Sequence, residues 1–292
     1  MRDKIAFCIC TNNRKSKLKK NLLSISRLKN LKNYNIEIIL VANDKSNYID
    51  ILSYFSKYLK INFFKENTSG VSYSRNKILG LLRKKKFKYA ALFDDDCIVS
   101  KNWLVSMIKM LKNKKADVVA GPQISQSKNI FLKIMERSQF HGIKIKWAST
   151  NNVFFKLSAI KNKVKFSNKL NRIGGEDQLF FLELNKLGKK IFWNSHAPVY
   201  ELIDKKRENF KWFLKRNLRY GTSAVIIYKT IYGNINGYFI LLVKLINDLY
   251  RLLNSLLKSL LFSKKDFFLF IMYNIRILGV LLGLLGFQIK EY

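Results

Sequence analysis

The hydrophobic positions of the chain alternate between short apolar runs and longer stretches with helical spacing. From residue 4 to residue 120 the two patterns take turns, as strands and helices do in α/β proteins. Predicted strands lie at 4–10, 36–42, 61–64, 89–93 and 116–120, and predicted helices at 15–31, 51–59, 71–82 and 103–111. This alternation is typical of a mostly parallel sheet with helices on both faces. We therefore expect an α/β fold.

Beyond Pro122 the pattern becomes less regular. It predicts a helix at 131–138, extended chain at 147–155, 189–193 and 198–202, a loop at 171–175, and a basic helix at 210–220 that ends at Gly221. The loop contains Gly174 and Gly175, and the helix after it begins with Glu176 and Asp177, where negative charge suits the helix dipole. Taken alone, this pattern also describes an ordinary acidic helix start.

The last part of the chain has a different character. Polar residues recur at three- and four-residue steps between 241 and 262, which leaves a broad Leu-rich helical face. The apolar stretch 267–287 is long enough to cross a bilayer, but Asn274 and Arg276 interrupt it and favour insertion at the membrane interface. Helices that cover the preceding domain or form a dimer would show the same pattern. We expect one domain over 1–225 and a membrane-associating helical tail over 226–292.

Composition limits the class of protein. The chain has 292 residues, of which 48% are hydrophobic, with only 2 Pro, so it can bury a substantial core. A formal charge of +36 suits acidic partners such as nucleic acid, anionic lipid or a phosphate-bearing substrate, without choosing among them. The 3 cysteines show no disulfide or zinc-ligand spacing, which indicates a reducing compartment. The charged start is followed by too short an apolar run to predict a signal peptide.

Three consecutive aspartates, Asp94, Asp95 and Asp96, follow the apolar strand at 89–93. Ligands of open α/β sheets bind at such strand ends. Three like charges repel one another unless they are solvated or a cation neutralises them, and a divalent ion is the obvious cation. Asp94 and Asp96 would leave an extended backbone on the same side and reach one ion, while Asp95 would point elsewhere. A solvated loop after a core strand is the alternative.

The residues after the first strand, TNNRKS, contain no glycine. A dinucleotide-binding fingerprint requires several glycines there, so this sequence argues against a dehydrogenase. A sugar nucleotidylyltransferase would share the sheet and the metal-binding aspartates, but it needs a Gly-rich loop with a basic residue at this position. A non-enzymatic membrane or nucleic-acid binder would use the positive charge but would have no use for the carboxylates.

In order and spacing, five segments resemble inverting glycosyltransferases of family 2, which have the GT-A fold. The resemblance covers about residues 4–225, and members that are non-processive, bacterial and membrane-associated are the most similar. The five segments are Thr11-Asn12-Asn13-Arg14, Asn43-Asp44-x-Ser46, Gly70-x-Ser72-x-Ser74-Arg75-Asn76, Asp94-Asp95-Asp96 and Glu176-Asp177. No segment is specific singly, but five in the correct order are.

The resemblance implies a role for each segment. It assigns Thr11, Asn12, Arg14 and Asp44 to the nucleotide of a nucleotide-sugar donor, and the triplet, with Asp95, to the diphosphate and the metal. The metal, Mn²⁺ or Mg²⁺, would be held by Asp94 and Asp96. Glu176 and Asp177 would lie on the acceptor side. Arg75 would pair with Asp94 or reach a phosphate.

The implied chemistry is a metal-assisted single displacement. The ion would neutralise the departing diphosphate, and Asp177 would take the proton of the acceptor hydroxyl. One base without a carboxylate nucleophile predicts inversion at the anomeric carbon. The Gln-x-x-Arg-Trp segment of processive members is replaced here by residues 215–220, so we expect a non-processive enzyme.

For three further residues the sequence is compatible with more than one role. Arg216 and Arg219 share a helical face that suits either a diphosphate or lipid. His196 lies where some GT-A enzymes place a late metal ligand, and a loop-facing imidazole is the alternative. As partners we expect a nucleotide-diphosphate sugar, a glycan or lipid-linked acceptor used for cell-envelope polysaccharide, and a membrane surface bound through 241–287, with no nucleic acid. The predicted location is cytoplasmic, on the inner face of the cell membrane.

Overall fold

The computed structural model describes residues 2–160, 164–260 and 263–290. The chain forms two compact units. The first unit comprises Met1–Gln126, Arg137–Asn168 and Phe180–Leu202, and the second comprises Ser127–Glu136, Lys169–Leu179 and Ile203–Tyr292.

Within the described residues, the first unit contains an eight-stranded sheet in the order β3-β2-β1-β4-β9-β6-β10-β8. Its strands are β1 (Lys4–Thr11), β2 (Asn35–Ala42), β3 (Lys60–Lys65), β4 (Tyr89–Asp94), β6 (Val118–Ala120), β8 (Lys144–Ile145), β9 (Asn152–Lys156) and β10 (Ile191–Trp193). The neighbours β3, β2, β1 and β4 are parallel, whereas β9 runs antiparallel between β4 and β6. A smaller sheet has the order β5-β11-β7, with β5 (Cys97–Val99), β7 (Gln123–Ser125) and β11 (Val199–Glu201).

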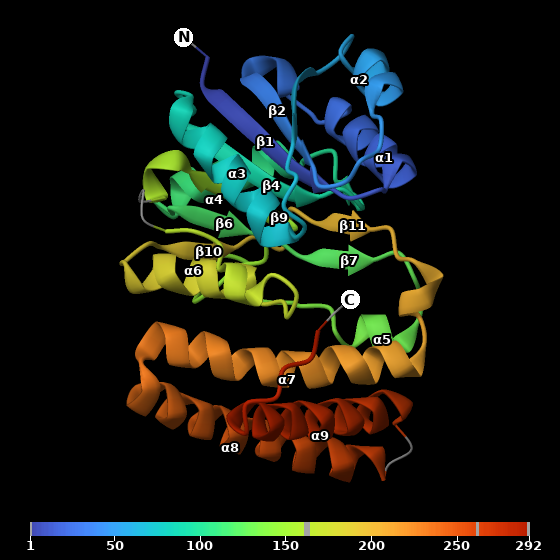
Figure 1. The fold of residues 1–292 in the computed structure, drawn as a ribbon, viewed down its shortest axis with the longest axis vertical. Coiled ribbons are helices and arrows are strands. Elements are labelled where there is room, and N and C mark those ends of the chain that lie inside the picture. The colour runs from blue at the N-terminus through green and yellow to red at the C-terminus, as the bar shows by residue number, and fades with distance from the viewer. Residues whose placement is uncertain (1, 161–163, 261–262, 291–292) are drawn as a thin grey trace. The chain divides into compact units, whose positions relative to one another are not determined.

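Helices cover both faces of the large sheet (Figure 1). The helices of the first unit are α1 (Lys15–Ser26), α2 (Ile49–Phe55), α3 (Val71–Lys84), α4 (Trp103–Asn113) and most of α6 (Glu176–Lys186), together with the short 3₁₀ segments η1 (Leu31–Asn33), η2 (Leu157–Ala159) and the start of η3 (Asn168–Leu170). In β1, Ile5, Phe7 and Ile9 pack with α1, α2 and α4, while Ala6 and Cys8 face α3 and α6. This alternation, with apolar residues on both sides, explains why the sequence shows continuous apolar runs.

The second unit is helical. Its elements are α5 (Ile130–Lys133), η4 (Lys205–Arg207), α7 (Phe210–Tyr232), α8 (Asn234–Ser259) and α9 (Lys264–Leu284). Figure 1 shows α7, α8 and α9 as three long helices lying side by side. Among the described residues, α9 is the helix long and apolar enough to cross a membrane, and little of it is buried.

The predicted helix end at Gly221 is wrong, because α7 continues through this residue to Tyr232. A side chain at Gly221 would come within 2.4 Å of the Arg276 carbonyl oxygen and 2.6 Å of the Gly279 Cα, so the glycine allows α7 and α9 to approach closely. The predicted domain boundary at residue 225 therefore lies inside one helix. The division into a domain over 1–225 and a tail over 226–292 stays a prediction.

Three other helices end earlier than predicted, and one of them is α2, which ends at Phe55 rather than at residue 59. α1 ends at Ser26 rather than at residue 31, because Asn30 adopts a left-handed conformation with φ 59° and starts a separate 3₁₀ turn. The helix predicted at 131–138 ends at Lys133, and Arg137 leaves it to stack on Trp147. The predicted tail helices at 241–262 and 267–287 correspond to α8 and α9, except that residues 261–262 lie outside the described residues.

Candidate active site

Three parallel strands of the first unit bring the predicted donor-binding segments to one edge of the sheet. Thr11 of β1 is in register with Ala42 of β2, and Cys10 is in register with Asp94 of β4. The loops that follow these strands therefore begin at the same level. The topology alone explains why segments so far apart in sequence meet here.

The aspartate triplet is held by residues of the first loop. The Thr11 hydroxyl donates a hydrogen bond of 2.7 Å to Asp95, and the Arg14 guanidinium lies 3.2 Å from Asp95 and 3.1 Å from Asp96. Asp95 and Asp96 are buried, whereas the Asp94 side chain is 38% exposed and lies 3.5 Å from Arg75. Asp94 and Asp96 thus face different cations. The prediction that Asp95 points elsewhere is wrong, because Asp95 shares Arg14 with Asp96.

The charges of this cluster perturb one another. Burial raises the pKa of the Asp95 carboxyl to about 6, and the neighbouring Asp96 and Asp94 also raise it, although Arg14 and Thr11 act in the opposite direction. Burial acts to lower the pKa of Arg14, but the attraction of Asp95 and Asp96 outweighs it and raises that pKa. Removing the Arg14 charge would therefore leave two buried carboxylates without their main counter-ion.

Asp44 organises the loop after β2. Its carboxylate accepts hydrogen bonds of 2.7 Å from the backbone N–H groups of Asn13 and Ser46 and from the Tyr48 hydroxyl. Burial acts to raise the pKa of Asp44, but these hydrogen bonds outweigh it and lower that pKa. Asp44 therefore joins the first two loops as an ionised acceptor, and Asn12 lies exposed beside them.

Sequence reasoning missed two residues that support the triplet. Asn21 is fully buried, and its amide donates to the carbonyls of Cys97, at 2.6 Å, and Asp94, at 3.3 Å. Lys17 donates to the Leu202 carbonyl at 2.7 Å and lies 3.9 Å from Asp96. For Asn21 the sequence did contain a signal, because its amide lies on the apolar side of a predicted helix. A buried amide at such a position requires a hydrogen-bonding partner.

The third predicted segment, which contains Arg75, also holds a neighbouring loop in place. Asn76 donates to the Phe166 carbonyl at 2.9 Å and accepts from the Phe166 N–H at 2.8 Å. The Ser72 hydroxyl donates to the Ser167 carbonyl at 3.0 Å, and the Arg75 guanidinium lies 5.7 Å from the centre of the Phe166 ring. This segment therefore fixes the chain just before Lys169, where the second unit continues.

The donor set of the triplet fits a divalent ion in one specific way. Within the part of the chain that the structure describes, no group of three or more His, Cys, Asp and Glu side chains is placed to hold a metal. Mg²⁺ and similar hard ions are commonly held by one or two carboxylates, with substrate phosphates and water completing the shell. Asp94 and Asp96 supply two such carboxylates, although in this structure Asp94 faces Arg75 and Asp96 faces Arg14, so the metal assignment stays a prediction.

Glu176 and Asp177 begin α6 in the second unit. Gly174 and Gly175 precede them with φ values of +82° and +93°, a conformation that residues with a side chain rarely adopt. Glu176 is buried, and the Asp177 carboxylate accepts a 2.7 Å hydrogen bond from the Gln178 N–H. Negative charge at this end of a helix is favoured by the dipole.

Arg219 supports that loop. It is buried, donates to the Ile173 carbonyl at 3.0 Å, and packs so closely on Gly174 that a side chain there would meet its guanidinium at 2.2 Å. Arg216 donates to the Tyr220 hydroxyl at 2.8 Å and lies over the Trp212 ring. The open role of Arg219 is therefore, at least in part, to position the loop before Glu176. In the first unit, the His196 ring stacks on His141 with ring centres 4.0 Å apart.

Comparison with known protein families identifies the family to which this chain belongs. The model of the Glycosyl transferase family 2 matches residues 6–174, which is more than half of the chain. The chain belongs to glycosyltransferase family 2. The resemblance inferred from the five segments is confirmed, and so is the predicted enzyme class, at the level of the family.

A curated relative is the succinoglycan biosynthesis protein ExoM of Rhizobium meliloti (strain 1021), which is 28% identical over 143 residues. That match covers 46% of this chain and 46% of ExoM, so the chain spans about half the length of the relative.

Solved structures of similar fold confirm the predicted GT-A class. The mannosyltransferase PcManGT of Pyrobaculum calidifontis, solved with GDP-Man and Mn²⁺, has a TM-score of 0.64 at 12% identity, with 98% of this chain and 88% of that one covered. TarS of S. aureus has a TM-score of 0.58 at 14% identity, with 81% of this chain and 41% of that one covered. A shorter form of TarS was solved with UDP-GlcNAc.

Proposed function

We propose that this family 2 member is an inverting glycosyltransferase that moves a sugar from a nucleoside-diphosphate sugar to an acceptor hydroxyl. The observation that carries the proposal is the meeting of Arg14, Asp44 and the aspartate triplet at one edge of the sheet. A nucleotide and a diphosphate require this combination of cations, hydrogen-bond acceptors and carboxylates. The nucleotide sugars bound by the similar structures support the same class of donor.

On the donor side, Thr11, Asn12 and Asp44 form the nucleotide part of the proposed site. The hydrogen bonds to Asp44 hold the first two loops in one conformation, so less order is lost when a nucleotide binds. Asp94 and Asp96 would hold Mn²⁺ or Mg²⁺, which when bound neutralises negative charge on the diphosphate leaving group. Arg75, at 3.5 Å from Asp94, adds a cation at the same place.

On the acceptor side, Asp177 takes the proton of the attacking hydroxyl. Its carboxylate lies in the first turn of α6, and a carboxylate can accept such a proton. Glu176 is the buried neighbour that helps to define this turn. A single displacement with one base inverts the anomeric carbon.

The second unit supports a membrane location for this reaction. On α8, large apolar side chains are exposed along one face, among them Ile246, Leu249, Leu253 and Leu257. Arg276, whose charge argued against a full membrane span, donates to Asn217 at 2.8 Å and so is paired within the unit. We infer that α8 and α9 rest on the inner face of the cell membrane and that the acceptor is a lipid-linked precursor of a cell-envelope polysaccharide. The role in succinoglycan biosynthesis named for ExoM supports this acceptor class.

Asp96→Asn tests the catalytic proposal. We expect release of nucleoside diphosphate from a panel of UDP-, GDP- and dTDP-sugars to require Mn²⁺ or Mg²⁺, and the variant to lose on the order of a hundredfold or more in turnover. Asp50→Asn, which removes an exposed carboxylate of α2, is the matched control and should keep full turnover. Unchanged turnover of Asp96→Asn, or wild-type turnover that EDTA leaves intact, would contradict the metal assignment.

A further inference from the structure

The helix α8 buries two polar residues and exposes several large apolar ones. Asp248 and Ser255 are buried, whereas Leu249 and Leu253, one residue or two away, are each 51% exposed. This helix therefore exposes large apolar side chains on one face and buries Asp248 and Ser255 together with Leu241 and Leu252. A cavity with a largely polar lining lies between α8 and α9.

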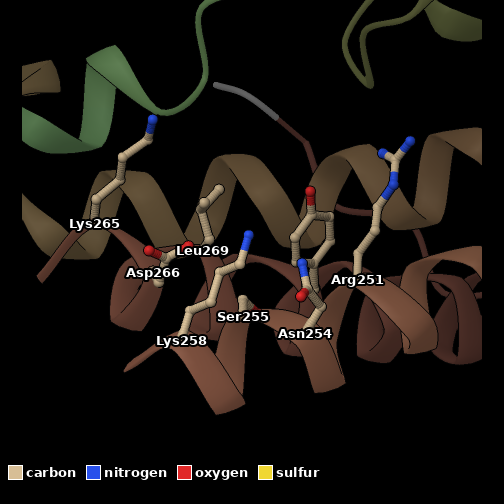
Figure 2. A pocket seen from close by; sticks show the side chains of 8 residues that line it. Arg251, Asn254, Ser255, Lys258, Lys265, Asp266 and Leu269 are labelled. Atoms are coloured by element: carbon tan, nitrogen blue, oxygen red, sulfur yellow. The ribbon is translucent and has the colours of Figure 1, made fainter. Parts of the chain in front are cut away.

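The cavity has a volume of about 420 Å³, within the range of small-molecule sites. Its lining includes Arg251 and Lys258 of α8 and Lys265 of α9 (Figure 2), together with polar groups of Asn254, Ser255 and Tyr273. Lys258 lies between Arg251 and Lys265 in this view. The space is larger than a phosphate group and can also accept the atoms attached to it.

The charges of the lining are unbalanced. Over residues 2–160, 164–260 and 263–290, none of the three cations forms an ion pair. The acid in the lining, Asp266, caps the start of α9 together with Ser263. The nearest acid of α8, Asp248, is paired with Lys244. Cations that share a cavity repel one another until an anion enters.

We propose that this cavity binds the phosphate group of an anionic membrane lipid. Arg251, Lys258 and Lys265 supply charge-assisted hydrogen bonds to the phosphate oxygens, and Asn254, Ser255 and Tyr273 supply neutral ones. Lipid is the source because the exposed apolar face of α8 adjoins the cavity, so a bound head group leaves its acyl chains beside Leu253 and Leu257. The inference rests on the proposed membrane location and adds a specific site to it.

The experiment is vesicle flotation of the full-length chain. The pocket variant carries Arg251→Gln, Lys258→Gln and Lys265→Gln. The matched control carries Lys101→Gln, Lys109→Gln and Lys112→Gln, which remove the same charge from exposed positions of the first unit. Vesicles contain phosphatidylcholine alone or with phosphatidic acid. All six positions are exposed, and near-ultraviolet circular dichroism and thermal melting check that both variants fold.

We expect the wild type and the control to bind phosphatidic acid vesicles and the pocket variant to bind them roughly a hundredfold more weakly, from the contribution of three cations near an anionic surface. Equal losses in both variants would show diffuse charge attraction and overturn the site. If the wild type binds both kinds of vesicle equally well, the proposed phosphate site is wrong but the proposed membrane location still holds. If the wild type binds neither vesicle, both proposals fail.

Competition by free inorganic pyrophosphate distinguishes the two possible ligands of the cavity, a lipid phosphate group and a free phosphate anion. We expect pyrophosphate to compete only weakly with vesicles, because it lacks the acyl chains that the apolar face of α8 would contact. If pyrophosphate raises the melting temperature of the wild type but not of the pocket variant, and the wild type does not discriminate between the vesicles, the cavity takes a free anion. The proposed lipid ligand would then be wrong.

Discussion

In the candidate active site, each carboxylate of the aspartate triplet has a distinct environment. Asp95 and Asp96 are buried and share Arg14, and the partly exposed Asp94 meets Arg75. Burial makes an unpaired carboxylate costly, so Arg14 is needed to keep these acids in place. Its assignment to the nucleotide stays a prediction, and the structure adds a positioning contact to the triplet.

At the same scale, Asp177→Asn should separate donor binding from chemistry. The amide keeps the size of the side chain but cannot take a proton, so we expect transfer to slow on the order of a hundredfold while donor affinity changes little. Donor titration and single-turnover transfer measure the two quantities. Glu183→Gln, on the same helix, is the control and should transfer normally. A collapse of donor affinity with unchanged turnover of bound donor would place Asp177 in the nucleotide site instead.

At the scale of elements, β2 carries a buried acid at the opposite end of the sheet from the triplet. Glu37 is 2% exposed and lies within 3.0 Å of Lys4 and 2.9 Å of Lys60. Burial alone would raise its pKa, but the hydrogen bonds of Lys60 and Lys4 outweigh burial and lower it from 4.5 to about 2. The ion pairs therefore join β2 to the adjacent strands β1 and β3.

Glu37→Gln should lower the free energy of unfolding by about 2 kcal/mol at neutral pH, a value reduced for the solvent exposure of the lysines. Because the folded-state pKa lies below the ordinary one, this stabilisation is present above about pH 4.5 and is lost as the pH falls toward 2. Urea unfolding at a series of pH values should thus show the wild type and the variant converging in acid. A difference that stays constant over this range would show that charge is not the cause.

A second element-scale feature is the glycine contact between α7 and α9. A methyl group at Gly279 would come within 2.3 Å of the Leu218 carbonyl oxygen, whereas nothing lies within 4 Å of one at Gly80 of α3. Gly279→Ala should destabilise the chain by about 1–3 kcal/mol, because the helices must separate. Gly80→Ala should instead be neutral or stabilising by roughly 0.5–1 kcal/mol. Thermal melting compares them, and equal effects would contradict the close helix contact.

For the whole molecule, the proposed membrane location rests on the exposed apolar face of α8. Leu249→Gln, Leu253→Gln and Leu257→Gln together should weaken vesicle binding on the order of tenfold or more, since each leucine loses apolar area to bury in lipid. The control replaces exposed Ile49, Tyr54 and Tyr58 of the first unit with Gln. If flotation is unchanged while wild-type dimers, seen by light scattering, dissociate in the α8 variant, the face contacts a second copy rather than lipid.

Local patterns in the sequence determined the strands, the helices and the order of the five segments. The period of apolar residues identifies β1, β2 and β4, and chain order places Thr11, Asp44 and Asp94 at their ends. These features depend on neighbouring residues and on the rule that parallel strands end together, so a single sequence contains them. Family membership followed from the same segments.

The tertiary structure alone decided which partner each side chain has. Gly221 is a typical helix terminator in sequence, yet α7 continues because Gly279 packs against it. Asn21 and Arg14 support the triplet across more than 70 residues of chain. Asp248 and Ser255 of α8 are buried because α7 and α9 pack beside this helix. The period of apolar residues shows that a helix has an apolar face. Which part of the protein covers that face, and which charged side chains pair, depends on contacts between distant segments. Those contacts form only in the folded chain.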